Sequence, residues 1–198
     1  MTIQSVCVFC GASTPPDPLF METARAVGKL LAAEGIELVY GAGRVGLMGA
    51  LADACLEGGG RVVGIIPGHL QDLEVGHNGL HELEVVEDMM ERKRRMIARS
   101  DAFLILGGGF GTLDELFEVL TFKQLRLHLK PIVILDTAGY WSPLIRSMEH
   151  MAEVGFIRQS DLHIYRVVDS LEQVVGALRA PQAPVPDPRS KVDPSFKE

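Results

Sequence analysis

Short apolar segments alternate with amphipathic segments along most of the chain. The apolar segments have the length and β-branched composition of strands, and they lie at 6–10, 36–40, 61–66, 83–86, 102–106, 131–135 and 163–168. Between most of them apolar residues recur at spacings of three and four, which predicts helices at 18–34, 47–58, 88–100, 112–127, 140–153 and 170–179. Because the strands are apolar throughout, we expect an α/β fold with a Rossmann-like open parallel sheet and helices on both faces.

The length and composition predict a single domain. The chain has 198 residues, of which 47% are hydrophobic and 23% charged, which is enough for a sizeable core. We assign residues 1–180 to one Rossmann-like nucleotide-binding domain. The segment that follows has four prolines in its first eight residues, PQAPVPDP. Because proline cannot join regular backbone pairing, we expect residues 181–198 to form a flexible tail.

The charge balance narrows the class of partner. The formal net charge is −7, whereas proteins that hold nucleic acids carry an excess of lysine and arginine. No segment remains uncharged for the ~18 residues that a membrane helix needs, and the start of the chain does not resemble a secretory signal. We therefore expect a cytoplasmic protein that binds neither nucleic acid nor membrane, with a small molecule as its partner.

The cysteines predict buried strand positions. There are three, an odd number that suits a reducing compartment. Cys7 and Cys10 form a C-x-x-C within a predicted strand, where residues three apart point to opposite faces of the sheet. They are therefore expected to be small core residues, and no metal site is predicted from them.

Glycines follow several predicted strands. Gly11 follows the first, GAGRVG at 41–46 the second and GGGFG at 107–111 the fifth. In an open parallel sheet these are the carboxyl ends of strands, where ligands bind. Turn formation would account for any one glycine, but their gathering at one edge favours a nucleotide-sized site.

Two common nucleotide motifs fail on their context. The motif G-x-G-x-x-G is matched by Gly41, Gly43 and Gly46. A dinucleotide site also requires an acidic residue about 20 positions later, at the end of the next strand. That region reads VVGIIPGHL and has no carboxylate. The lysine of the P-loop motif is missing as well, which argues against a nucleoside triphosphatase.

The stretch GGGFGTLDE at 107–115 has the features of a phosphate loop. Backbone N–H groups from Gly108 to Thr112, at the start of a helix, would hold a phosphate dianion. Thr112 would add a hydroxyl or cap the helix. Asp114 and Glu115 could simply complement the helix dipole, but neighbouring helical residues point ~100° apart. One acid is therefore expected to face solvent while the other overhangs the ligand.

A second group of candidates lies in DMMERKRRM, at the start of the predicted helix 88–100. At ~100° per residue, Lys93 falls in the middle of the apolar face and Arg92 at its edge, whereas Arg94 and Arg95 fall outside. A cation on a buried face must pair, bind a ligand or extend to water. Arg92 and Lys93 are therefore the better site candidates, although a solvated basic face is the plainer interpretation.

Taken together, these segments resemble the Lonely Guy (LOG) family, the cytokinin riboside 5′-monophosphate phosphoribohydrolases and their bacterial relatives. The family pattern PGGxGTxxE is matched by residues 107–115 except at its first position, and the arginine-lysine signature by residues 91–93 followed by Met96. VCVFCGAS, LVYGAGRVGLMG and GIIPGHL are also similar to family segments and occur in family order. The resemblance thus spans about residues 3–170.

The resemblance implies hydrolysis of the N-glycosidic bond of AMP or an N6-substituted AMP, which releases the free base and ribose 5-phosphate. Arg92 and Glu115 match positions that the family uses in catalysis. A carboxylate beside the sugar stabilises an oxocarbenium-like transition state, the role expected of Glu115, while Arg92 would anchor the nucleotide or assist the departing purine. The substrate-binding positions carried over are Ser13, Gly43, Glu74, Lys93, Gly108, Gly109, Phe110, Gly111, Thr112 and Thr121.

The resemblance also implies a homodimer that pairs through helices beside the site. The reaction needs no metal or cofactor, and no cluster of histidines and acids in the sequence demands a metal. Such proteins are similar to ones labelled lysine decarboxylases, but no lysine here has the context of a pyridoxal phosphate site. The alternative is a sensor that binds AMP-type nucleotides without turnover, and the retained Arg92 and Glu115 favour the enzyme.

Four positions depart from the family pattern. Gly107 stands in place of proline, Asp114 where glutamate is common, Ala42 within a usual run of three glycines, and Met90 where histidine often precedes the catalytic arginine. Gly107 is expected to loosen the start of the loop, because glycine has more backbone freedom to lose than proline. The catalytic positions are retained, so the departures bear on which N6 substituent is preferred.

Overall fold

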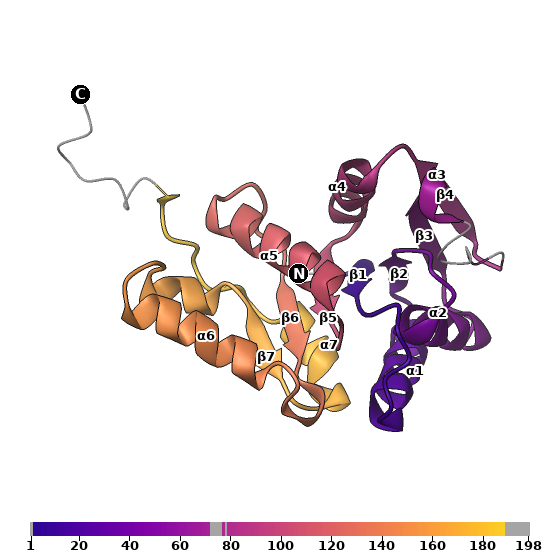
Figure 1. Ribbon diagram of the computed structural model, residues 1–198, viewed down its shortest axis with the longest axis horizontal. Coiled ribbons are helices and arrows are strands. Elements are labelled where there is room, and N and C mark those ends of the chain that lie inside the picture. Colours follow the sequence, from indigo (N-terminus) through magenta and orange to yellow (C-terminus); the bar gives the residue numbers. More distant parts are fainter. Residues whose placement is uncertain (1, 72–76, 78, 189–198) are drawn as a thin grey trace.

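The computed structural model describes residues 2–71, 77 and 79–188 and shows a sheet with helices packed on both faces (Figure 1). The elements in chain order are β1 Ser5–Phe9, α1 Pro18–Ala33, β2 Glu37–Tyr40, α2 Gly46–Glu57, β3 Val62–Pro67, α3 Gly68–Gln71, β4 Glu82–Val86, α4 Met89–Arg99, β5 Ala102–Ile105, α5 Phe110–Gln124, β6 Ile132–Leu135, the 3₁₀ helix η1 Thr137–Gly139, α6 Ser142–Glu153, the 3₁₀ helix η2 Gln159–His163, β7 Arg166–Val168 and α7 Leu171–Arg179. The strands lie in the order β4-β3-β2-β1-β5-β6-β7, and each neighbouring pair is parallel. The predicted Rossmann-like parallel sheet is confirmed.

Two hydrophobic cores cover the two faces of the sheet. Alternate residues of β1 enter different cores, because successive side chains of a strand point to opposite faces. One core includes Val8 and Cys10 and is closed by α1, α2 and α7, and the other includes Cys7 and Phe9 and is closed by α4, α5 and α6. Cys7 and Cys10 are thus buried on opposite faces, as predicted, and Cys55 is a buried free thiol in the first core.

The predicted helices and strands agree with the structure to within a few residues at most ends. The final strand begins at Arg166, later than predicted, and His163 belongs to η2 instead. In η2 the Asp161 carboxylate accepts from the Arg158 backbone N–H at 3.0 Å and closes the turn. The short helix α3 was not predicted. No helix among the described residues has both the length and the apolar character needed to cross a membrane.

The sheet reverses its winding between β1 and β5, and this position creates the site. Strands added after β1 run outward on one side and those from β5 onward run outward on the other. The turns that leave β1 and β5 meet there, and the N–H of Gly11 donates to the carbonyl of Gly107 at 3.0 Å. A ligand crevice is expected outside the carboxyl ends of strands at such a switch point.

The beginning of the proline-rich C-terminal segment lies against the domain. Val185 is 7% exposed and joins the core beneath α5, and Arg126 Nε donates to its carbonyl at 3.1 Å. Proline lacks a donor, but every residue in such a segment keeps a carbonyl acceptor, and basic side chains of the domain bind these acceptors. The prediction of a flexible tail did not anticipate these contacts for residues 181–188, and residues 189–198 lie outside the described residues.

A buried lysine of α5 also contacts this segment. Lys123 is 1% exposed, and its Nζ donates to Gln182 Oε1 at 3.0 Å. Burial, together with the nearby charge of Arg166, lowers the pKa of Lys123 to about 8. Below that pH the native state holds a desolvated cation, which opposes folding.

We expect Lys123→Met to raise the free energy of unfolding at pH 7 by about 1–3 kcal/mol, because it removes this desolvated charge. In the wild type, stability should rise as the pH increases from about 8 toward the ordinary lysine pKa of 10.5, since the unfolded chain then holds more protons than the native chain. The variant should lose that rise. Urea denaturation followed by the fluorescence of the single tryptophan measures both effects. The exposed Lys29→Met on α1 is the matched control, and an unchanged pH profile in Lys123→Met would contradict the assignment.

Candidate active site

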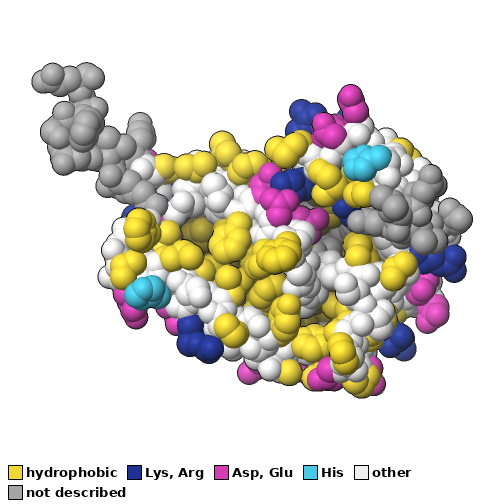
Figure 2. All heavy atoms as spheres, in the orientation of Figure 1, with side chains coloured by type: hydrophobic (Ala, Val, Ile, Leu, Met, Phe, Trp, Pro, Cys, Tyr) yellow, Lys and Arg dark blue, Asp and Glu magenta, His cyan; other side chains and the backbone are white. Residues whose placement is uncertain are grey.

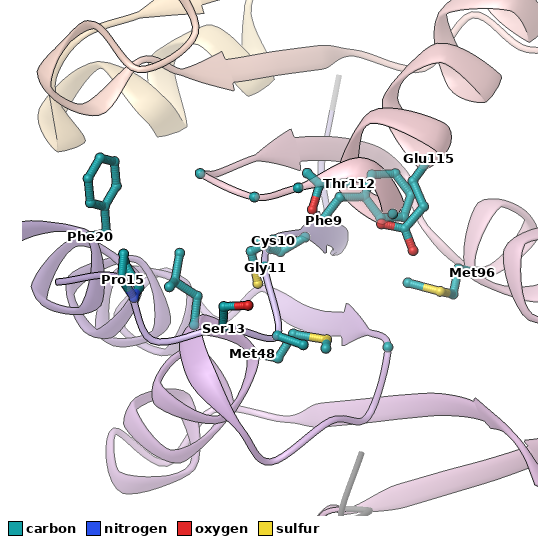
Figure 3. A pocket seen from close by; sticks show the side chains of 18 of the residues that line it. Phe9, Cys10, Gly11, Ser13, Pro15, Phe20, Met48, Met96, Thr112 and Glu115 are labelled. Carbon is teal, nitrogen blue, oxygen red and sulfur yellow. The ribbon is translucent and has the colours of Figure 1, made fainter. Parts of the chain in front are cut away.

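A cavity of about 490 Å³ opens at the switch point of the sheet. Its wall is formed by the turn after β1, the start of α2, one face of α4 and the first turns of α5. Figure 3 shows Glu115 extending from α5 into the cavity, with Thr112 on the same helix and Ser13 and Met48 on the opposite wall. The residues that the sequence placed at separate strand ends are therefore brought together at one cavity.

The start of α5 forms one end of the cavity. Gly109 is the N-cap residue, and no side chain among the described residues caps this helix. The first N–H groups of a helix have no partner within the helix, and together with the helix dipole they attract an anion. Gly108, Gly109, Gly111 and Thr112 all line the cavity here. This end of the cavity has the character of a phosphate site.

Glycine is required at position 108 for packing. A Cβ atom there would collide with the side chain of Thr112, which is 3% exposed, and would come within 3.0 Å of the Gly11 nitrogen. The turns after β1 and β5 therefore approach one another only because these side chains are absent. Close packing thus explains the glycine at position 108, whereas a Cβ at Gly109 or Gly111 would meet nothing within 4 Å.

Arg92 enters the cavity from α4 and is 4% exposed. Its guanidinium donates from Nε to the Ile65 carbonyl at 3.1 Å and from Nη2 to the Gly41 carbonyl at 2.7 Å. These carbonyls belong to β3 and to the turn that follows β2, so the charge is held by the sheet as well as by its own helix. A Cβ on Gly41 would overlap with Nη2 of Arg92, which explains the glycine at this position.

Glu115 lines the cavity one helical turn beyond Gly111. Its carboxylate affects the pKa values of two thiols, that of Cys7 in β1 and that of Cys10 just after β1. Burial is the main cause that raises the pKa of Cys7 and of Cys10, and the negative charge of Glu115 raises both further. Cys10 lines the cavity, and its thiol therefore stays protonated and does not serve as a nucleophile at neutral pH.

Lys93 points toward α5 and does not line this cavity. Its Nζ lies 3.0 Å from Asp114 Oδ2 and 3.2 Å from Glu118 Oε1. Burial would lower the pKa of Lys93, but the hydrogen bonds and charges of Asp114 and Glu118 outweigh burial and raise it. The expected separation of the two acids is observed, because Asp114 is exposed and binds Lys93 while Glu115 faces the cavity.

The helical layout of the basic residues is confirmed by their burial. Arg92 and Lys93 are buried, whereas Arg94 and Arg95 are exposed and form ion pairs with Glu91. The division into a buried and an exposed pair follows the face assignment, although Arg92, expected at the edge of the face, is slightly more buried (4% exposed) than Lys93 (7% exposed).

The other predicted substrate-binding residues divide into three groups. Ser13 lines the cavity with the glycines and Thr112. Gly43, Phe110 and Thr121 are not among its lining residues, and the Phe110 side chain is 93% exposed. Glu74 lies outside the described residues. Which of these residues contact a nucleotide stays a prediction.

Sequence reasoning missed the apolar and aromatic part of the cavity wall. This part comprises Phe20, Leu47, Met48, Leu70, Met89, Met96 and Tyr140. The sequence pattern placed the methionines of α4 on the apolar face of the helix, but it did not show that they line the cavity. Tyr140 follows a glycine just beyond β6, the same type of strand-end signal as the other glycine turns, and that signal could have found it.

Ala42 adopts a left-handed conformation, with φ of 62°, in the turn after β2. A side chain at this φ costs about 1–3 kcal/mol, and the family pattern has glycine there. Ala42 is fully buried, and its carbonyl accepts from the His77 N–H at 3.1 Å. The surrounding contacts therefore hold a strained residue next to Gly41, which binds Arg92.

The chain matches a family model described as possible lysine decarboxylase over residues 48–178. It is 44% identical to a cytokinin riboside 5′-monophosphate phosphoribohydrolase of Rhodococcoides fascians, over 91% of this chain and 91% of that protein. It is 39% identical to cytokinin riboside 5′-monophosphate phosphoribohydrolase LOG1 of Arabidopsis thaliana, over 88% of this chain and 82% of that protein.

Solved structures with lower identity share the fold. The molybdenum cofactor carrier protein of Chlamydomonas reinhardtii has a TM-score of 0.67 at 18% identity, covering 90% of this chain and 96% of that chain. The molybdenum cofactor binding protein of Rippkaea orientalis has a TM-score of 0.64 at 21% identity, covering 89% and 95%. At this identity the likeness concerns the fold alone.

We expect Gly41→Ala to destabilise the protein by about 1–3 kcal/mol, because the new methyl group overlaps a guanidinium that is fixed from two sides. Gly176→Ala on α7 is the matched control, since a Cβ there meets nothing within 4 Å, and it should be neutral or slightly stabilising. Urea denaturation measures both. In an Arg92→Ala background the cost of Gly41→Ala should largely disappear. Additive costs in this double-mutant cycle would refute a contact between the two residues.

Proposed function

The chain belongs to the Lonely Guy family of cytokinin riboside 5′-monophosphate phosphoribohydrolases, and we propose that it hydrolyses the N-glycosidic bond of AMP or an N6-substituted AMP. The products are the free base and ribose 5-phosphate. The single observation that carries the proposal is the shared cavity: Arg92 and Glu115 line the same space as the uncapped, glycine-rich start of α5.

The dimensions of α5 support this substrate. Gly111 and Glu115 are separated by about 6 Å along the helix axis, at 1.5 Å per residue. This separation is comparable with the reach of a ribose 5-phosphate from its phosphate to its anomeric carbon. With the phosphate at the helix start, Glu115 lies beside the carbon whose bond to the base is broken.

The residues then have distinct roles in the reaction. As the bond between the anomeric carbon and the base nitrogen breaks, the sugar gains positive charge, which the Glu115 carboxylate stabilises. A water oxygen bonds to the anomeric carbon and gives up a proton, and the departing base gains one. Glu115 orients this water. Arg92, held by two backbone carbonyls, supplies a fixed positive charge for the phosphate, the ribose or the base.

The description of the family model as possible lysine decarboxylase does not fit the residues of this cavity. No lysine is found among the described residues that line it. Lys93 follows the cavity residue Arg92 in the sequence, but it is held by two carboxylates, and its pKa is raised. An imine-forming lysine needs the opposite, a pKa low enough to release the neutral amine. The cavity therefore supports glycoside hydrolysis and not pyridoxal phosphate chemistry.

Incubation of the purified protein with AMP and with N6-isopentenyl-AMP, followed by chromatography of the free base, tests the proposal. Release of base with equal amounts of ribose 5-phosphate is expected. Tight binding of either nucleotide without release at any pH would favour the alternative, a nucleotide-binding sensor.

Glu115→Gln should bind AMP with nearly unchanged affinity but lower kcat by at least about 100-fold, because it removes a charge that acts mainly in the transition state. Asp114→Asn is the matched control: it changes the neighbouring carboxylate, which faces away from the cavity, and should alter kcat by less than about threefold. Calorimetric binding and steady-state kinetics measure the two effects. A kcat near the wild-type value in Glu115→Gln would show that this carboxylate interacts favourably with the helix dipole but takes no part in catalysis.

A homodimer is the second part of the proposal. Hydrophobic side chains gather over α5 and α6 on the face shown in Figure 2. Beside the site, Met90 on α4 is 65% exposed, and Leu127, after α5, is 67% exposed. Both line a groove between α4 and α5. Val85, Ile97 and Phe122 also line it, together with charged residues of α4 and of the segment before it. Exposed apolar patches of this kind mark association surfaces, and a second copy is the expected occupant.

Sedimentation equilibrium should give twice the chain mass of 21.6 kDa. Met90→Glu should shift the mass toward that of one chain, because a buried unpaired carboxylate disfavours the interface. Leu19→Glu, which changes an exposed residue of α1 on the other face of the sheet, serves as the control. A wild-type mass of one chain at working concentration would exclude the dimer.

A further inference from the structure

Tyr140 connects the segment after β6 to the glycine loop before α5. Its hydroxyl donates a hydrogen bond to the Gly108 carbonyl at 2.6 Å, and the residue lines the cavity. We propose that Tyr140 is a positioning residue for the phosphate loop, which turns the Gly108–Gly109 peptide so that its amide hydrogen faces the ligand. This inference rests on the proposed function, because it assumes that the loop binds the 5′-phosphate.

The direction of the amide follows from peptide geometry. In a trans peptide the carbonyl of one residue and the N–H of the next point in opposite directions. Because Tyr140 holds the Gly108 carbonyl on its own side, the N–H of Gly109 points away from Tyr140. Gly109 is the N-cap of α5, so this N–H joins the other free amides of the helix start.

Among the described residues, only the Tyr140 hydroxyl donates a hydrogen bond to the Gly108 carbonyl. Positions 107, 108 and 109 are all glycine, and glycine loses more conformational freedom on ordering than other residues. The Gly107 carbonyl is fixed by the N–H of Gly11, but that bond leaves the next peptide free to rotate. The hydrogen bond from Tyr140 acts on that next peptide.

Aromatic rings fill the space beside Gly107. A Cβ atom on Gly107 would lie 3.1 Å from Phe20 Cδ1 and 3.9 Å from Tyr140 Cδ1. The rings of Phe20 and Tyr140 pack edge to face, with centroids 5.5 Å apart and an interplanar angle of 75°. The space that a proline ring would need at position 107 is therefore occupied, and the aromatic pair restrains the loop from outside.

The side chain of Tyr140 is 45% exposed, but the segment that carries it is fixed by several contacts. The Asp136 carboxylate, at the end of β6, accepts from the backbone N–H of Trp141 at 2.6 Å and from Ser142 Oγ at 2.8 Å. The Trp141 side chain is 4% exposed, and its ring packs on that of Tyr140 at a centroid distance of 4.7 Å. A rigid anchor allows one hydroxyl to set the direction of a flexible peptide.

Tyr140→Phe is the direct test, because it keeps the ring contacts and removes only the hydroxyl. Affinity for AMP should fall by about tenfold, while affinity for adenosine, which lacks the phosphate, should remain within about twofold. With AMP as substrate, KM should rise more than kcat falls, because the lost contact is remote from the reacting bond. Isothermal titration calorimetry and steady-state kinetics on the full chain measure these values.

Tyr40→Phe is the matched control. The Tyr40 hydroxyl is buried in the core and has no hydrogen-bond partner among the described residues, so its removal should leave AMP affinity unchanged. Thermal melting of both variants should stay within about 3 °C of the wild type, which separates loop positioning from general destabilisation.

The outcomes separate this inference from the proposed function. A tenfold loss for AMP in Tyr140→Phe with adenosine unaffected supports it. An unchanged affinity for AMP, or an equal loss for AMP and adenosine, overturns it while the proposed function stands. If the wild-type protein itself binds AMP no more tightly than adenosine, the phosphate site is absent, and the proposed function and this inference both fail.

Discussion

The hydrogen bond between the Gly11 N–H and the Gly107 carbonyl is the contact on which the site depends. It joins the turns that leave β1 and β5, the two central strands whose chain continues on opposite sides of the sheet. A Cβ atom on Gly11 would come within 3.3 Å of the Gly108 Cα, so this approach leaves no room for ordinary side chains. The start of α5 is thereby placed over the end of β1, and the cavity is the space that remains between them.

The charges around the cavity are sorted by helical geometry. Adjacent residues of a helix point ~100° apart, so each neighbouring pair of charged residues must serve two directions. On α4, Arg92 faces the cavity and Lys93 faces α5, and on α5, Glu115 faces the cavity and Asp114 faces Lys93. One residue of each pair thus connects the two helices, and the other lines the cavity. The ammonium group of the buried Lys93 is directed toward α5 by Asp114 and Glu118.

Patterns with a fixed period could be read from the sequence, and contacts that depend on distant segments could not. The strands, the helices, the two faces of the sheet and the inward face of α4 all follow from periods of two and 3.6 residues. The meeting of the glycine turns follows from the rule for parallel sheets. By contrast, the hydrogen bond of Tyr140 to Gly108 joins residues 32 positions apart and has no periodic signature. The packing of Val185 could not be predicted from the proline content of its segment. Prolines show which backbone donors a segment lacks, but not where its carbonyl acceptors bind.

Glu115 offers a reason why the anion site that we propose consists of backbone amides and not of lysines. A lysine in the cavity would pair with this carboxylate, as Lys93 pairs with Asp114 and Glu118, and would then be lost to a phosphate. Backbone amides at a helix start have a fixed position and direction. They therefore cannot move to form an ion pair with a carboxylate, as a lysine side chain can. Arg92 is fixed from the side of the sheet by the two backbone carbonyls that accept from its guanidinium. The catalytic carboxylate and the phosphate site that we propose can therefore share a small cavity, because rigid dipoles and an anchored guanidinium would bind the anion.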